Sequence, residues 1–440
     1  MKVNAACQQA AARLGTLDRE PPRDRLRLVF LRVLAGVARP FVPGSPPRKL
    51  PGALHGSENS LEKGLPADQH GLGACGKVLV IRPDHLGDLL FATPALQSLR
   101  ESFPSAHVTA LVGPWGRDIV ARNPHVDVVR TCSFPWFDRQ PKPSLFAPYR
   151  LLWRETAALR VLDFDVALNL RPDFWWGAAL TYLARIPVRI GYDVPACRPF
   201  LTTRVPHEGA YHDVERNLAL VRPDRFPIAP PVSKHDATAL LPGPKDTVVK
   251  PVRSLAYEPT DEERAWAART LAGHEPAVAI SPGAGTRCKQ WTIEGWVAVI
   301  DILTADRGLR TVLVGGPTEV DLCRAIAARV TQPALVLAGE TTLGQLAALF
   351  GRCRLVVGID SGPLNLAVAQ GTSTVHLFGP ADPVQFGPWG PPERHAVVRA
   401  DLACVPCRKL DWPLAGDEVT PCMAAIAPAD VVAAAARVLT

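Results

Sequence analysis

A short turn late in the chain has the residue types of an anion-binding site. Asp360, Ser361 and Gly362 follow an apolar run at 355–358 and precede a segment with apolar residues at helical spacing. The first N–H groups of a helix lack intrahelical partners, and together with the helix dipole they favour phosphate. Asp360 and Ser361 are good capping residues, and Gly362 allows a ligand close to the backbone. The turn therefore predicts a phosphate site, with an ordinary capped helix as the alternative.

A second site, far upstream, offers a carboxylate. Residues 77–81 have the pattern of a β-branched strand, and residues 89–103 have apolar residues at helical spacing. The turn between them ends in Gly87 and Asp88. A helix dipole favours the charged form of a carboxylate at the helix start, so Asp88 is available as a proton acceptor. The alternative is that Asp88 only caps the helix.

Further motifs follow in the second half of the chain. SPGAGTRCKQW stands at 281–291, Gly-Gly-Pro at 315–317 and Phe-Gly-Pro at 378–380. In this order, and over residues 76–425, the motifs resemble glycosyltransferase family 9, the heptosyltransferases of the lipopolysaccharide inner core. The resemblance implies an α/β protein of the GT-B fold, in which two Rossmann-like parallel-sheet domains face each other across a cleft.

The resemblance also implies roles for individual residues. Asp88 is expected to be the base that deprotonates the acceptor hydroxyl, and Lys289 to neutralise charge on the departing diphosphate. Lys289 is also an expected donor contact, and the others are Gly87, Thr286, Asp360, Ser361, Gly362 and Asn365. The expected acceptor contacts are Arg82, Asp84, Tyr192 and His212. For these four residues, surface packing or solvation of the loop is the alternative.

These roles imply a reaction. One carboxylate without an opposing nucleophile suits an inverting single displacement. Lys289 and the helix terminus would replace a divalent metal, so neither a metal nor another cofactor is expected. The resemblance implies transfer of heptose from ADP-heptose to a lipid-linked saccharide. Two alternatives stay open: a relative that uses another nucleotide sugar for a different surface glycan, and a non-catalytic nucleotide-sugar or glycolipid-binding protein. Binding alone would not need a base such as Asp88.

Asn365 departs from the family pattern, which usually has His at this place. An Asn side chain donates hydrogen bonds but does not titrate near neutral pH. We therefore expect altered donor contacts at Asn365, without loss of the base or of the phosphate site.

Three other features bear on metal and cofactor chemistry. The Asp-Phe-Asp triplet at 163–165 matches the DxD of metal-dependent glycosyltransferases, but it runs directly into an apolar strand. Gly-x-Gly-x-x-Gly is absent after the first strand, which argues against a dehydrogenase. Cys404, Cys407 and Cys422 have metal-like spacing without a fourth ligand, so reduced thiols are expected.

Composition suits the same class of protein. The 440 residues, 47% hydrophobic and 21% charged, predict two α/β domains that each bury their own core. The net charge of +7 indicates acidic partners, namely nucleotide phosphates, lipid phosphates or an anionic inner-membrane surface. No nucleic acid is expected, because no Lys/Arg block is interleaved with aromatic residues. The absence of a long apolar run and of a signal peptide, with ten cysteines, predicts a cytoplasmic protein that is peripheral on the inner membrane.

Three regions are expected along the chain. Residues 1–75 are an extension and linker, in which 23–41 form a basic amphipathic helix that either lies on an anionic membrane or packs on the first domain. Residues 76–250 are expected to bind the acceptor, and residues 251–440 the nucleotide sugar, with a C-terminal helix at 428–439. The predicted strands are 77–82, 107–112, 126–130, 165–170, 188–190, 277–281, 311–315, 334–337, 355–358 and 373–378. Ligands of such sheets bind at the carboxyl ends of the strands, where both motifs lie.

Overall fold

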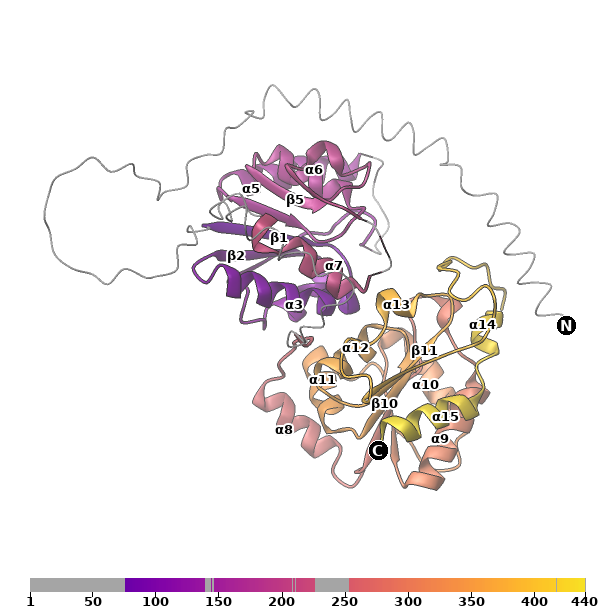
Figure 1. Ribbon diagram of the computed structural model, residues 1–440. Helices are drawn as coiled ribbons and strands as arrows, with labels where there is room; N and C mark the ends of the chain where they lie inside the picture. Colours follow the sequence, from indigo (N-terminus) through magenta and orange to yellow (C-terminus); the bar gives the residue numbers. More distant parts are fainter. Residues whose placement is uncertain are drawn as a thin grey trace, which may run out of the picture.

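The structure is a computed structural model that describes residues 76–138, 144, 146–207, 209, 211–225, 253–416 and 418–439. The extension at 1–75, with the amphipathic helix expected at 23–41, lies outside the described residues. Two six-stranded parallel sheets form the frame of the described chain (Figure 1).

The first sheet has the strand order β3-β2-β1-β4-β5-β6. Its strands are β1 (Lys77–Arg82), β2 (His107–Val112), β3 (Val128–Thr131), β4 (Val166–Asn169), β5 (Val188–Tyr192) and β6 (Thr203–Val205). The central strand β1 is buried from Val78 onwards, as expected for a parallel sheet that is covered on both faces. In Figure 1, one face carries α3 (Leu86–Ser102) and α7 (Asp213–Leu220), and the other carries α5 (Ala147–Arg160) and α6 (Trp175–Leu183). The short helix α4 (Arg117–Val120) follows β2.

The second sheet has the order β12-β11-β10-β7-β8-β9. Its strands are β7 (Ala277–Ser281), β8 (Arg310–Leu313), β9 (Leu335–Val336), β10 (Leu355–Ile359), β11 (Thr374–Phe378) and β12 (His395–Arg399). One set of alternate β7 residues packs with α8 (Asp261–Thr270), α11 (Leu343–Arg352) and α12 (Gly362–Ala369). The other set packs with α9 (Ile293–Arg307), α10 (Val320–Ala327) and α15 (Pro428–Val438). The short helices α13 (Pro383–Phe386) and α14 (Pro421–Ala424) follow β11 and β12.

The predicted α/β architecture is confirmed. Every predicted strand lies in one of the two sheets, and the predicted C-terminal helix is α15. Of the four edge strands, the sequence predicts β3 and β9 but not β6 and β12, because β6 has three residues and β12 follows a stretch rich in Pro and Gly at 387–392. Helix α3 begins at Leu86, two residues before Asp88, which the sequence predicts at or near the first helical position, so the turn before the helix is shorter than expected.

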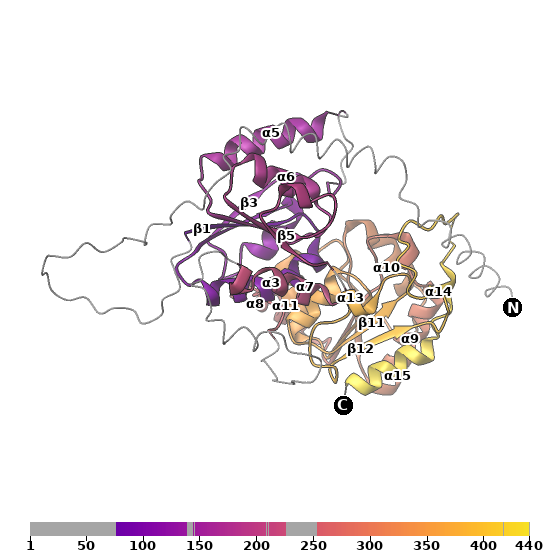
Figure 2. The same ribbon diagram turned by 45° about the horizontal axis from the view of Figure 1, so that its top comes forward.

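Helix α3 also connects the two halves of the molecule. It packs on α12 of the second domain as well as on its own sheet (Figures 1 and 2). Leu96 of α3, Ala347 of α11 and Leu364 of α12 belong to one buried apolar cluster. The expectation of a separate core for each domain is therefore only partly correct. The reason lies in α3 itself, because consecutive apolar residues at 89–92 are all buried and give the helix more than one apolar side.

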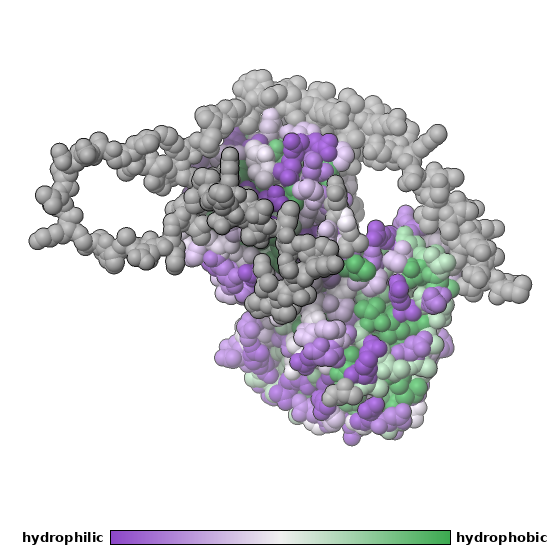
Figure 3. Space-filling view, viewed as in Figure 1, coloured by the Kyte–Doolittle hydropathy of each residue, from purple (hydrophilic) through white to green (hydrophobic). Residues whose placement is uncertain are grey.

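The surface of the second domain is mixed in character. Figure 3 shows polar side chains over much of its visible face, with apolar side chains gathered on its right-hand side in this view. Within the described residues, we find no helix with the length and apolar character of a membrane span.

Candidate active site

The proposed base lies where β1 passes into α3. Asp88 is in the first turn of α3, whose N-cap is His85. The carboxylate of Asp88 does not cap the helix, so that alternative is wrong. Its Oδ1 lies 3.5 Å from Nη2 of Arg82, and 28% of the Asp88 side chain is exposed. Asp88 therefore faces both the solvent and a buried cation.

Arg82 is the centre of a buried polar cluster. Its Nε lies 2.7 Å from Asp84 Oδ2, and its Nη2 lies 2.7 Å from Asp213 Oδ2. Its Nη1 donates to the carbonyl of Leu170 and to Oδ1 of Asn217, at 3.1 and 3.0 Å. Only 3% of the Arg82 side chain is exposed. Arg82 and Asp84 do not merely solvate the loop, so that alternative is wrong, while their contact with an acceptor stays a prediction.

Burial and the charges of this cluster together shift the protonation of the base. Burial, and next the negative charge of Asp84, raise the pKa of Asp88 from its ordinary value to about 7, and Arg82 opposes this rise. Asp213 raises the pKa further, and Arg171 lowers it. A base is most effective when its pKa lies near the operating pH. Asp88 thus combines access to solvent with a protonation equilibrium near neutrality.

A second charged pair lies at the carboxyl ends of β7 and β10, which are neighbours in the second sheet. Lys289 ends a 3-10 turn at Arg287–Lys289, and its Nζ donates to Asp360 Oδ2 at 2.7 Å. The side chains are 18% and 8% exposed, so Lys289 is not a solvated loop lysine. Burial raises the pKa of Asp360, and the Lys289 ammonium opposes this. Thr286 begins the same turn, and its hydroxyl lies 3.4 Å from Cys288 Sγ.

The start of α12 keeps polar groups without protein partners. Ser361 is the N-cap, but its side chain makes no capping hydrogen bond. Ser361 therefore occupies the expected cap position without the expected side-chain bond, and Asp360 does not cap the helix, because its carboxylate accepts from Lys289. Among the described residues, Ser361 Oγ and Asn365 Oδ1 are buried and have no hydrogen-bond partner. Buried polar atoms are normally satisfied, so these atoms beside a helix N-terminus fit a polar ligand.

The starts of α3 and α12 meet at two glycines. A Cβ added to Gly87 would lie 3.1 Å from Asn365 Nδ2, and one added to Gly362 would lie 2.7 Å from Leu86 Cγ. Each glycine therefore permits a close approach that a larger residue would disturb. Through this contact Gly87, the neighbour of Asp88, lies against the start of α12. Asn365 is 4% exposed and faces α3, and its expected donor contact stays a prediction.

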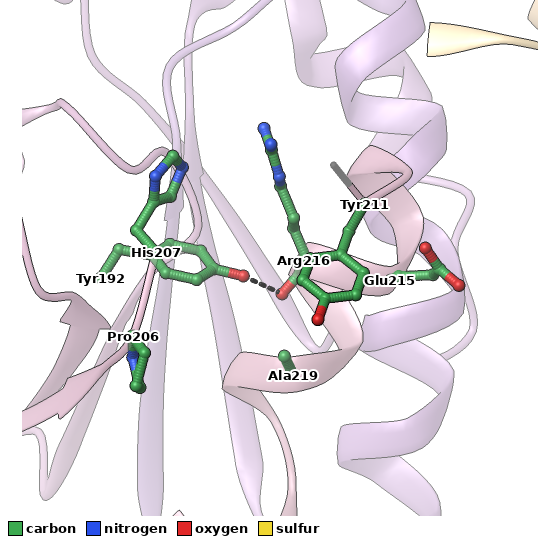
Figure 4. A pocket seen from close by; sticks show the side chains of 7 residues that line it. All are labelled: Tyr192, Pro206, His207, Tyr211, Glu215, Arg216 and Ala219. Atoms are coloured by element: carbon green, nitrogen blue, oxygen red, sulfur yellow. Dashed lines mark hydrogen bonds between the residues drawn. The ribbon is translucent and has the colours of Figure 1, made fainter. Parts of the chain in front are cut away.

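Tyr192 belongs to a cavity on the first domain. It is buried, and its hydroxyl donates to the carbonyl of Arg216 at 2.6 Å. The cavity has a volume of about 240 Å³, and its lining residues are Tyr192, Pro206, His207, Tyr211, Glu215, Arg216 and Ala219. Figure 4 shows the rings of Tyr192 and His207 on one side, with Arg216 and Tyr211 on the other. Tyr192 thus packs inside the protein and not on its surface, and its acceptor contact stays a prediction.

His212 lies between the domains. It is the N-cap of α7, where its Nδ1 accepts from the amide of Val214 at 3.1 Å. Its Nε2 donates to the carbonyl of Gly387 in the second domain at 2.9 Å, and its ring packs on Trp389. Both ring nitrogens are thus engaged within the protein, which favours the packing alternative, although the contact is buried and not on the surface. The predicted acceptor contact of His212 is not favoured by this arrangement.

Sequence reasoning missed Asp213, which together with Asn217 holds Arg82. Asp213 and Asn217 are four positions apart on α7 and so share a face of the helix, which is the one signal that the sequence offered. It did not indicate what this polar face contacts. The packing of α7 against α3 is what places this polar face over the end of β1.

The alternative metal features lie elsewhere. Asp165 Oδ2 accepts from the amide of Lys77 at 2.8 Å, at the amino end of β1 and so at the edge of the sheet opposite to Asp88. Cys404, Cys407 and Cys422 line one small cavity, and burial raises the pKa of Cys422. The described residues hold no group of three or more His, Cys, Asp or Glu arranged to bind a metal ion.

Comparisons with known proteins agree on one family. The model of glycosyltransferase family 9 (heptosyltransferase) matches residues 152–414. Lipopolysaccharide heptosyltransferase 3 of Escherichia coli is 30% identical over 312 residues, which cover 69% of this chain and 83% of that protein. The family 9 glycosyltransferase of Veillonella parvula has a TM-score of 0.63 at 21% identity, covering 84% of this chain and 98% of that one. For the E. coli ADP-heptose lps heptosyltransferase II, the TM-score is 0.61 at 22% identity, with coverages of 82% and 98%. The predicted GT-B fold is confirmed.

Proposed function

Because the chain belongs to glycosyltransferase family 9, we propose that it transfers heptose from ADP-heptose to a lipid-linked saccharide of the lipopolysaccharide core type. The names of the similar E. coli proteins support this choice of donor and pathway. We propose further that transfer proceeds with inversion and without a divalent metal, on the cytoplasmic side of the inner membrane. The proposed division of labour places the acceptor on residues 76–250 and the donor on residues 251–440.

The donor side of the proposal rests on the Lys289–Asp360 pair beside the start of α12. Lys289 is a partly buried ammonium, and the helix start offers unpaired N–H groups. Both favour the two phosphates of ADP and the charge that builds on them as the sugar leaves. The other proposed donor contacts are Gly87, Thr286, Ser361, Gly362 and Asn365.

The acceptor side of the proposal rests on Asp88. The deprotonated carboxylate takes the proton of the acceptor hydroxyl as its oxygen attacks the anomeric carbon. The bond from that carbon to the diphosphate breaks at the same time, on the opposite face of the sugar, and its electrons go to ADP. The contact between Gly87 and α12 supports this assignment, because it holds the base within one residue of the proposed donor site.

The cavity beside Tyr192 is the proposed place of the acceptor saccharide. It lies at the carboxyl ends of β5 and β6, and α7 connects it to Asp213 of the Arg82 cluster. The rings of Tyr192 and Tyr211 suit a sugar face, and Arg216 and His207 suit an acidic substituent on that sugar.

A panel of nucleotide sugars tests this function. ADP-heptose should raise the melting temperature of the protein and, with a lipid-linked core acceptor, release ADP. If the protein instead released a nucleoside diphosphate from a different nucleotide sugar, its function would be the transfer of that other sugar to a different surface glycan. If ADP-heptose raised the melting temperature but no acceptor caused release of ADP, the result would support a non-catalytic binding protein.

A further inference from the structure

Helix α5 presents large apolar side chains to the outside. The exposed fractions are 74% for Phe146, 37% for Tyr149, 61% for Trp153 and 81% for Val161. Most surface helices direct charged and polar residues outwards instead. Ten large apolar side chains are exposed in the described part of the chain, and five of them, including Trp136, fall within residues 136–161. This exposure is concentrated in one place, which marks an interaction site.

These side chains share one face of the helix. Phe146 and Val161 flank α5, and Tyr149 and Trp153 follow Phe146 at helical spacing. The buried residues of α5, which include Leu152 and Leu159, point to the domain core instead. Figure 2 shows α5 as the outermost helix of the first domain.

Trp136 extends the same surface. Its ring packs on Trp175 at 5.7 Å, and the next residue, Trp176, donates from its indole to the carbonyl of Pro148 in α5. We define the α5 ridge as Trp136, Phe146, Tyr149, Arg150, Trp153, Arg154 and Val161.

The charges of the ridge are positive. Arg150 and Arg154 directly follow Tyr149 and Trp153, and 73% of the Arg154 side chain is exposed. The acidic residue of α5 is Glu155, whose side chain is 12% exposed and paired with Arg154. The outward face thus combines aromatic rings with guanidinium groups and presents little negative charge.

We propose that the α5 ridge docks the first domain on an anionic lipid bilayer. Aromatic side chains favour the boundary between headgroups and acyl chains, and arginine stems cover apolar surface while their guanidinium groups reach lipid phosphates. The charge complementarity selects a membrane over a protein surface of mixed charge. The inference extends the proposed function, because a bilayer presents a lipid-linked acceptor to the domain that carries Asp88.

Vesicle binding by the full-length protein tests this surface. One variant combines Phe146→Ser, Tyr149→Ser and Trp153→Ser, and a second combines Arg150→Gln and Arg154→Gln. The matched control combines Val384→Ser, Val397→Ser and Leu410→Ser, three apolar side chains of the second domain that are 56%, 37% and 43% exposed. The probes are vesicles of phosphatidylethanolamine with phosphatidylglycerol, and vesicles of phosphatidylcholine alone.

The parent and the control should bind the anionic vesicles equally well. Each ridge variant should bind about 10-fold more weakly or worse, since both apolar burial and charge contribute. Brominated lipid should quench tryptophan fluorescence in the parent and less in Trp153→Phe. Full binding by both ridge variants, or no binding by the parent, would overturn the proposal. The vesicles contain no acceptor, so vesicle binding does not depend on the proposed transfer reaction. ADP binding and melting temperature are measured on every variant, so a loss of docking can be distinguished from a loss of the fold.

Discussion

The ammonium of Lys289 donates to the carboxylate of Asp360 at 2.7 Å, across the carboxyl ends of two adjacent parallel strands. Both side chains are largely buried, so each charge needs the other to offset the free energy that it loses by leaving water. A diphosphate at the start of α12 would meet an ammonium that is already held in position. The same pair therefore serves both the fold and the proposed chemistry, and substitutions can separate these two contributions.

Lys289→Ala should lose both stability and ADP affinity. It leaves the Asp360 carboxylate buried without its cation, which costs about 3–5 kcal/mol for a well-buried pair. The double variant Lys289→Ala with Asp360→Asn removes both charges and should recover most of the melting temperature. ADP affinity, measured by calorimetry, should stay at least about 10-fold reduced in the double variant. Recovery of ADP binding along with stability would show that Lys289 has only a structural role.

The Asp88→Asn variant should still bind the donor nucleotide but should lose most of its transferase activity. The change is nearly isosteric, and it removes the proton acceptor, so turnover should fall about 10²-fold or more. The melting temperature and the ADP affinity should stay close to those of the parent. Turnover within a few-fold of the parent would exclude Asp88 as the base.

The activity of the parent should rise with pH through about 7, because burial raises the pKa of Asp88 to about 7 and only its deprotonated form can act as a base. Asp213→Asn removes a negative charge that favours the protonated form, so the rising limb should move to lower pH. Asp173→Asn is the matched control, as it removes an exposed carboxylate paired with Arg171. The pH profile of kcat/KM checks both variants, and a limb that stays in place in Asp213→Asn would contradict the assignment.

Gly362→Ala should disturb the contact between α3 and α12. Its Cβ would lie 2.7 Å from Leu86 Cγ, and overpacking of this kind costs about 1–3 kcal/mol. A Cβ on Gly362 would also lie 2.8 Å from Leu86 Cβ, which alanine would keep, so the added substitution is Leu86→Gly, which should restore part of the lost melting temperature. The coupling energy from this double-mutant cycle measures the contact. Strictly additive effects would mean that the two helix starts do not touch in solution.

The sequence predicted much of the site because its motifs stand at strand ends. Once β7 and β10 are placed in one parallel sheet, Lys289 and Asp360 must lie near each other even though 71 positions separate them. What the motifs did not reveal was how each side chain would be used. Asp360 has the right type and position to cap α12, but a nearby ammonium is a stronger partner than a backbone amide, and the structure shows the ion pair.

The buried cluster around Arg82 could not be predicted in the same way. Its partner Asp213 lies 131 positions away on a helix, and no motif links the two. A sequence shows that a polar helix face exists, but it does not show which buried charge that face will contact. The aromatic face of α5 raises the same difficulty, since its apolar residues would ordinarily be assigned to the core.

The apolar cluster that runs from α3 through α11 to α12 has a thermodynamic consequence. Domains with independent cores can melt at different temperatures, whereas domains that share one must lose it together. Heating should therefore give one cooperative transition, with calorimetric and van't Hoff enthalpies in agreement. ADP bound to the second domain would then raise the melting temperature of the first sheet as well, although the nucleotide need not touch it.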